Sequence, residues 1–151
     1  MPRPLLTSTF DPAVYEYSET AIAKGIDNSI PPDLLPKLQA HHAHIVVPCL
    51  HEFSGLALSS GYRSPALNDA VGSRNKNSQH TRAEAADLDV DDRDLKTLFN
   101  FILRNVPYDQ MIYESYGGKR WVHTSYVEEG RRASHLATDN GKTFQVQEFF
   151  V

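Results

Sequence analysis

The stretch Ser78–Asp87 (SQHTRAEAAD), taken together with Trp121–His123 (WVH), decides how this chain is interpreted. It places one imidazole, that of His80, seven residues before the carboxylate of Asp87, and a second imidazole, His123, lies on a separate apolar segment. Two histidines and one carboxylate are a common ligand set for catalytic zinc, with the fourth position open to water. If the three side chains converge, the sequence predicts a zinc hydrolase.

Local patterns place these residues where they can converge. Ala85–Val90 is an apolar run that predicts a buried strand, and Asp87 lies inside it, where a carboxylate needs a partner such as a metal ion. Arg120–Tyr126 predicts a second strand, in which His123 points to the same face as Trp121. The alternative is that each is an ordinary polar residue, and the buried carboxylate favours the metal.

Length and composition are those of one ordinary globular domain. The chain has 151 residues, of which 40% are hydrophobic and 23% charged, and its net charge is −4. There is no basic run, so we expect no nucleic-acid partner, and no stretch approaches the ~20 apolar residues of a membrane span. The first residues lack the apolar run of a signal peptide, so we expect synthesis in the cytoplasm. We expect residues 1–151 to form a single domain and a monomer, with Cys49 as a buried, inert thiol.

The apolar pattern predicts an α+β fold, a mostly antiparallel sheet flanked by helices. Residues 1–17 are expected to form an extended N-terminal arm. Helices are expected between Ser18 and Gly25, over 33–53 with a kink or break at Pro48, over 65–71, and from a cap at Asp92 to Leu103. Strands are expected over 56–60, 85–90, 108–113, 120–126 and 143–151, with a surface loop at 72–79 and a hairpin turn at 117–118.

The pattern Ser-x-His-x-x-Ala-x-Ala-x-Asp followed by Trp-x-His resembles the mark of the M15 zinc peptidases, which include D-Ala-D-Ala carboxypeptidases and murein endopeptidases. The similarity runs from about Ser18 to Tyr126 and includes four further stretches, Gly25–Asn28, Ser60–Ser64, Leu67–Asn68 and Asp109–Glu114. The resemblance implies a small DD-peptidase-like domain, related in fold to hedgehog signalling domains. It also implies zinc bound by His80, Asp87 and His123.

The resemblance further implies a general base and a substrate-facing cation. Several M15 branches place a carboxylate three residues before the last zinc histidine, where this chain has Arg120, which cannot act as a base. The base is therefore assigned to Glu114, across the predicted hairpin, because hedgehog domains carry a similar Tyr-Glu-Ser. Such a carboxylate takes a proton from water and delivers it to the leaving amine. Arg63 matches the family arginine that faces the substrate carbonyl or carboxylate.

Two further residues are predicted substrate contacts, Ser78 and Trp121. Ser78 has the equal alternative of holding the His80 loop. Without the resemblance, Glu114 would be interpreted as an exposed strand-end residue and Arg63 as part of a surface ion pair.

One position departs from the family pattern. Ala83 stands where the family has Gly, which would permit a turn with positive φ. Since Ala is small, we expect a modest local adjustment.

Other polar residues are predicted to be unrelated to the site. His41 and His44 share a helix face without a third ligand, and His135 stands alone, so all three are expected to be solvated. Asp87–Asp91 resembles the start of a calcium loop, but Asp92 replaces the required Gly, and the closing Glu is missing.

These features predict a zinc peptidase that hydrolyses a peptide bond in the stem peptides of bacterial peptidoglycan. Its short length and missing leader resemble a phage endolysin, acting on the wall after release or as part of the virion. Cleavage by a carboxypeptidase or by an endopeptidase is left open. The alternative is a non-catalytic zinc domain that binds the cell wall or a protein partner, and the presence of Glu114, Arg63 and Ser78 favours the enzyme.

Overall fold

A six-stranded sheet organises the computed structural model, which describes residues 3–73, 75–138, 143–146 and 148–149. The strands follow the order β1-β2-β4-β3-β5-β6, and every neighbouring pair is antiparallel except β3 with β5. Their bounds are Ala57–Ser60 (β1), Ala85–Asp89 (β2), Gln110–Tyr116 (β3), Lys119–Ser125 (β4), Ala133–Ala137 (β5) and Thr143–Gln145 (β6). The predicted α+β fold with a mostly antiparallel sheet is confirmed.

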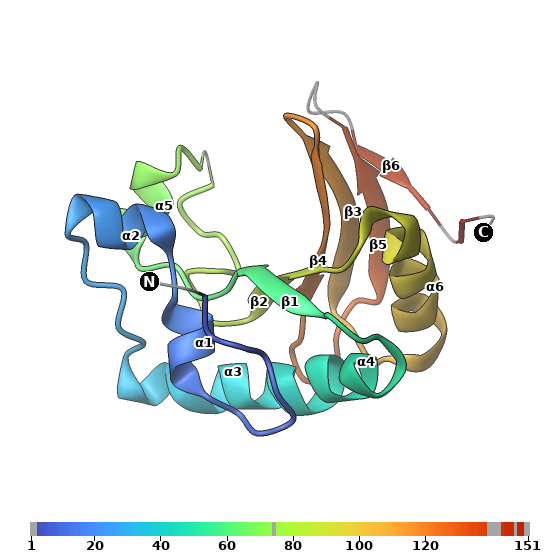
Figure 1. The fold of residues 1–151 in the computed structure, drawn as a ribbon, viewed down its shortest axis with the longest axis horizontal. Helices are drawn as coiled ribbons and strands as arrows, with labels where there is room; N and C mark the ends of the chain where they lie inside the picture. The colour runs from blue at the N-terminus through green and yellow to red at the C-terminus, as the bar shows by residue number, and fades with distance from the viewer. Residues whose placement is uncertain (1–2, 74, 139–142, 147, 150–151) are drawn as a thin grey trace.

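Helices surround this sheet (Figure 1), with α3 and α4 running below β1 and β2, α6 beside β3 and β5, and α2 and α5 at the opposite end. Their bounds are Pro12–Glu16 (α1), Glu19–Lys24 (α2), Leu35–His41 (α3), Val47–Glu52 (α4), Pro65–Ala70 (α5) and Leu95–Asn105 (α6). Short 3-10 turns at Pro32–Leu34 and Asp92–Asp94 precede α3 and α6, and a π-helical segment, His42–Val46, joins α3 to α4. The described part of the chain contains no helix with the length and apolarity needed to cross a bilayer.

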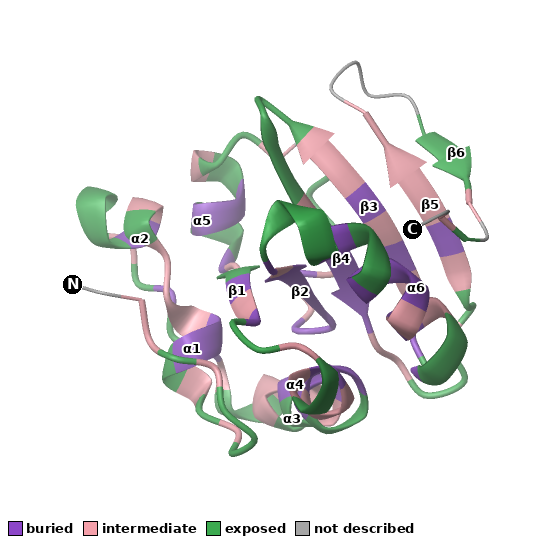
Figure 2. Ribbon diagram, turned by 45° about the vertical axis from the view of Figure 1, so that its right-hand side comes forward, coloured by how far each residue is buried: buried purple, intermediate pink, exposed green. Residues whose placement is uncertain are grey.

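The two faces of the sheet have different roles. Strand register sets Asp87 opposite His123, and His123 opposite Ile112, so these side chains leave the same face. The side chains at the intervening strand positions leave the opposite face. There the ring of Tyr113 on β3 packs against Phe99 of α6, with 6.3 Å between the ring centroids. Figure 2 shows β2 as buried along most of its length. The hydrophobic core therefore lies behind the strands that carry the predicted ligands.

The prediction of an extended N-terminal arm over residues 1–17 is wrong for its second half. Asp11 accepts a hydrogen bond from the Ala13 amide, and Pro12 follows it at the first helical position, so the pair begins α1. Helix α1 buries Tyr15 completely, and the Tyr15 hydroxyl lies 3.0 Å from Nδ1 of His42. The segment is thus part of the core.

The helix predicted over 33–53 changes geometry rather than ending at Pro48. A proline cannot donate a backbone hydrogen bond, and the chain widens into the π segment His42–Val46 just before it. Pro48 then occupies the first turn of α4, which continues to Glu52.

Three further boundaries differ from the predictions. The carboxylate that caps the turn before α6 is Asp91, which accepts from the Arg93 amide, rather than Asp92. Strand β5 was not predicted, because its short sequence, Ala-Ser-His-Leu-Ala, has no strong strand preference and is fixed as a strand by pairing with β3. The last predicted strand is limited to β6, and part of its predicted range, residues 147 and 150–151, lies outside the described residues.

Candidate metal centre and active site

His80, Asp87 and His123 converge on one point. Each offers one ligand atom, and these atoms lie within 4.8 Å of one another. Oδ1 of Asp87 is 3.3 Å from Nε2 of His80 and 3.0 Å from Nδ1 of His123. All three residues are buried, which favours a shared cation over three separately solvated side chains.

A hydrogen bond to the turn after β1 orients the His80 ring, and a second hydrogen bond holds its backbone. Nδ1 of His80 lies 2.7 Å from the carbonyl oxygen of Gly61, so Nδ1–H donates and Nε2 is left to face Asp87. The hydroxyl of Ser78 accepts from the His80 backbone amide at 3.2 Å. This contact supports the loop-holding role of Ser78, and its contact with substrate stays a prediction. Gly61 is itself pressed against α1, because a Cβ there would lie 2.5 Å from the Tyr15 carbonyl oxygen.

The pKa values of His80 and Asp87 are shifted in the direction that metal binding requires. Burial lowers the pKa of His80, which leaves the ring neutral at physiological pH. Burial by itself would raise the pKa of Asp87, but the adjacent His80 and His123 hold it well below its usual range. One carboxylate and two imidazoles therefore fit a zinc ion by their chemistry as well as by their convergence.

Ala83 adopts the backbone conformation that the family glycine would allow. Its φ is +59°, and its side chain is fully buried. The turn is closed by the Glu84 amide, which donates to the Gln79 carbonyl at 3.0 Å. Thus the loop keeps a positive-φ turn beside His80, with the strain of an L-residue in the left-handed region.

Glu114 leaves the sheet on the same face as the metal group. It lies opposite Trp121, and the next pair along this face of the hairpin is Ile112 with His123. Burial and the charge of Asp87 raise the pKa of Glu114 to about 7, and His123 and Arg63 partly oppose them. A carboxyl group with such a pKa can gain or lose a proton near neutral pH.

Arg63 is placed by the turn between β1 and α5. Its backbone amide donates to the His80 carbonyl at 3.2 Å, and its guanidinium donates to Oδ1 of Asn68 at 3.1 Å. Among the residues that the structure describes, Arg63 has no carboxylate within ion-pair distance, which argues against a surface ion pair. The guanidinium is held in place by a neutral partner, so no neighbouring carboxylate in the described part of the chain neutralises its charge, and it can interact with a negative group on another molecule.

A cleft adjoins the metal group at this point. It has a volume of about 920 Å³ and is lined by parts of β1, α5 and β4, including Ser60, Arg63 and Trp121. Ser60 is the register partner of Asp87, so the cleft begins beside a predicted ligand. The predicted substrate contact Trp121 is half-buried on its wall.

The sequence did not predict a buried polar cluster around Asp109, which contacts the His80 loop through Gln79. The carboxylate of Asp109, only 2% exposed, accepts hydrogen bonds from Gln79 at 2.8 Å, from Ser125 at 3.0 Å and from Arg131 at 2.9 Å. The Arg131 guanidinium holds the pKa of Asp109 far below its usual range. The available signal was that Asp109 is an acidic residue directly before a strand and the first residue of the family-like stretch Asp109–Glu114.

Two predictions about histidines are wrong. His41 is fully buried instead of solvated, because its helix face turns into the core. His135 is half-buried on β5, and its buried Nδ1 has no hydrogen-bond partner among the described residues. His44 is exposed, as predicted.

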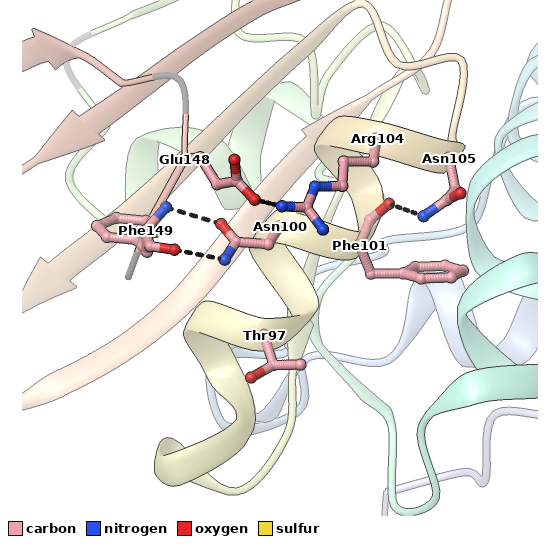
Figure 3. A pocket seen from close by; sticks show the side chains of 7 residues that line it. All are labelled: Thr97, Asn100, Phe101, Arg104, Asn105, Glu148 and Phe149. Atoms are coloured by element: carbon pink, nitrogen blue, oxygen red, sulfur yellow. Dashed lines mark hydrogen bonds and ion pairs between the residues drawn. The ribbon is translucent and has the colours of Figure 1, made fainter. Parts of the chain in front are cut away.

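A second cavity, of about 570 Å³, lies between α6 and the C-terminal segment (Figure 3). Several of its polar groups are paired with one another. Asn100 exchanges two hydrogen bonds of 2.8 Å with the backbone of Phe149, and Arg104 pairs with Glu148. The cavity therefore lies where residues 148–149 pack on α6, and the two charged residues of its lining pair with each other.

The fold and the buried His–Asp–His group define the chain as a small α+β protein with a candidate metal centre. A family model described as peptidase M15 matches residues 8–125, which include all three residues of that group. The chain belongs to the M15 peptidases, a family that is zinc-dependent in general. A search of curated proteins gave no match.

Proposed function

We propose that this protein is a zinc metallopeptidase that hydrolyses a peptide bond in the stem peptides of bacterial peptidoglycan. Membership of the M15 peptidases supports the class of reaction. The observation that carries the proposal is the shared face of the sheet, on which Glu114 lies near the converged His80, Asp87 and His123. The peptidoglycan substrate follows from the resemblance to D-Ala-D-Ala carboxypeptidases and murein endopeptidases.

In this proposal His80, Asp87 and His123 hold the zinc ion. When bound, zinc lowers the pKa of a coordinated water and polarises a carbonyl group. Glu114 takes the proton of the attacking water and delivers it to the amine that leaves when the peptide bond breaks. Arg63 and Trp121 line the adjoining cleft, where the guanidinium stabilises negative charge on the substrate.

A non-catalytic zinc domain that binds the wall or a protein partner is the second candidate. It accounts for the metal ligands, but it gives no reason for a half-buried carboxyl group with a pKa near 7 on the same face. It also gives no reason for a fixed arginine without a carboxylate partner. Groups with perturbed pKa values concentrate at active sites, and we therefore favour the enzyme.

Purified peptidoglycan is the direct test. We expect the zinc-loaded protein to release shortened or uncrosslinked muropeptides, detected by mass spectrometry, and a chelator to stop the reaction. The masses also separate loss of a terminal D-Ala from cleavage inside the peptide. A protein that binds zinc and the wall but leaves all muropeptide masses unchanged would establish the binding domain instead. His123→Ala, which removes one ligand, serves as the metal-free control.

A further inference from the structure

His41 reaches the metal-bearing strands from behind. It is the last residue of α3, where the helix widens into the π segment, and it is fully buried. Its Nε2 lies 2.9 Å from Oγ1 of Thr124. Thr124 follows His123 on β4 and therefore points to the opposite face of the sheet. This contact is a polar one in a region otherwise filled by apolar side chains.

Thr124 connects this histidine to a second strand. Its hydroxyl donates to the carbonyl oxygen of Ala86 at 2.8 Å, and Ala86 precedes Asp87 on β2. In the strand register Ala86 lies opposite Thr124, and Asp87 lies opposite His123. One hydroxyl thus bridges the two strands at the backbone positions next to two of the three candidate ligands.

The direction of these hydrogen bonds follows from counting protons. The single proton of the Thr124 hydroxyl goes to Ala86, so Oγ1 must accept from Nε2–H of His41. Burial lowers the pKa of His41 to about 3, so the ring is neutral and has one N–H. Nδ1 then carries no proton, which agrees with the absence of a hydrogen-bond partner for it in the part of the chain that the structure describes. The two hydrogen bonds therefore have one direction, with His41 donating to Thr124 and Thr124 donating to Ala86.

We propose that His41 and Thr124 are positioning residues, which hold β2 and β4 at the spacing that brings Asp87 against His123. The role rests on the metal centre of the proposed function. Apolar side chains of the same shape could fill this space with similar stability, since a buried hydrogen bond adds little net free energy. The hydrogen bonds from His41 through Thr124 to Ala86 add a directional restraint on the backbones of β2 and β4, directly behind the candidate ligands. Residues that orient metal ligands from outside the ligand set tune metal affinity.

Thr124→Val tests this role because it keeps the shape of the side chain and removes the hydroxyl. We expect zinc affinity, measured by competition with a chelator, to fall by at most about 10-fold, because groups bonded directly to a ligand change it by about 10–100-fold and Thr124 acts only through the backbone. We also expect the visible spectrum of the cobalt(II)-substituted protein to change, since it reports ligand geometry. Thr124→Ser restores the hydroxyl and is expected to restore both readouts.

His42→Phe is the matched control. His42 is the next residue of the same helix and is also buried, but it bonds to Tyr15 and to the Ser8 carbonyl, away from the metal strands. It should lower the free energy of unfolding while zinc affinity and the cobalt spectrum stay unchanged. If Thr124→Val does not fold, His41→Gln and His41→Phe are compared by the same two readouts, since only Gln keeps a donor.

Wild-type affinity and an unaltered cobalt spectrum in folded Thr124→Val would overturn the proposal, as would an equal loss of affinity in the His42 control. Neither readout uses a peptide substrate. A wild-type protein that binds zinc but cuts no peptidoglycan would refute only the proposed substrate. A wild-type protein that binds no zinc would refute the metal centre and this role together.

Discussion

Glu114 combines a position on the metal face with a carboxyl pKa near neutrality, as a general base requires. We expect Glu114→Gln to keep zinc and fold but to lose about 10²–10⁴-fold in turnover, because the amide has the shape of the acid and cannot transfer the proton. Steady-state kinetics with zinc analysis decide this. Glu52→Gln, on the exposed surface of α4, is the control for a neutralised glutamate. Near wild-type turnover would assign the base to another group.

The same residue predicts a pH effect on the stability of the metal-free protein. The pKa of Glu114 is about 7 in the folded state and roughly 4.3 in an unfolded chain, so the folded state binds more protons between these values. The free energy of unfolding contributed by this group therefore falls as pH rises through that window. Urea titrations from pH 4 to pH 8 should show wild type losing stability relative to Glu114→Gln. A constant difference would contradict the raised pKa.

Arg63 should act on the substrate and not on the metal or the fold. We expect Arg63→Ala to lose about 10²–10³-fold in turnover, and Arg63→Lys to lose less, because Lys keeps the charge without the planar fork. Zinc content and melting temperature should stay normal in both. Full activity of Arg63→Ala would remove the residue from the site, and joint loss of zinc and stability would make it a structural support of the His80 loop.

Replacing Ala83 by Gly has opposing effects of similar size on the free energy of unfolding. Ala83→Gly relieves about 1–2 kcal/mol of left-handed backbone strain. It also removes a buried methyl worth about 0.8 kcal/mol and adds about 0.4–1 kcal/mol of unfolded-chain entropy. We therefore expect the free energy of unfolding to change by less than about 1 kcal/mol, with zinc retained. Ala83→Val adds a β-branched side chain at positive φ in a fully buried position, and should unfold the loop and lose zinc.

At the scale of elements, alternation and turn chemistry predicted the strands that carry the site. The buried run around Asp87, the face shared by Trp121 and His123, and the Gly117–Gly118 turn all depend on local sequence, and the register agrees with each of them. The three residues of the candidate metal group lie in or directly beside the same stretches. Local sequence could not show the pairing of β5 or the burial of His41, because both depend on distant neighbours. The π segment also escaped prediction, since only the packed helix shows where Pro48 is accommodated.

Asp109 joins two elements that carry proposed metal ligands. Gln79 precedes His80 in the loop, and Ser125 lies two residues after His123 on β4, and both bond to this carboxylate. We expect Asp109→Asn to lower the free energy of unfolding by about 3 kcal/mol, since a hydrogen bond to a charged group is worth about 1.5–3 kcal/mol and several are lost or weakened. Urea titration at pH 7 measures this loss.

The pH dependence of this effect has a definite sign. The pKa of Asp109 is lowered in the folded state, so the stability it adds is present above roughly pH 4 and is lost as pH falls further. The difference between wild type and Asp109→Asn should therefore shrink in acid. Arg131→Met is the control for one partner alone. It should have a smaller effect, because the Arg131 side chain is 59% exposed. A difference that stays constant down to pH 2 would mean that Asp109 acts through shape and not through charge.

At the scale of the whole molecule, zinc should couple the loop, β2 and β4, because one ligand comes from each. A ligand that binds only the folded state adds about 4 kcal/mol when its free concentration is about 1,000 times its dissociation constant. For a chain of this size, each kcal/mol shifts the melting temperature by roughly 2–4 °C. We therefore expect a chelator to lower the melting temperature by about 8–16 °C and added zinc to restore it. His123→Ala should melt at one temperature with and without zinc, because two ligands hold the ion too weakly. Wild type that melts identically in chelator and in zinc would show that the His–Asp–His group is held without a metal, with the hydrogen bond between Asp87 and His123 as its direct link.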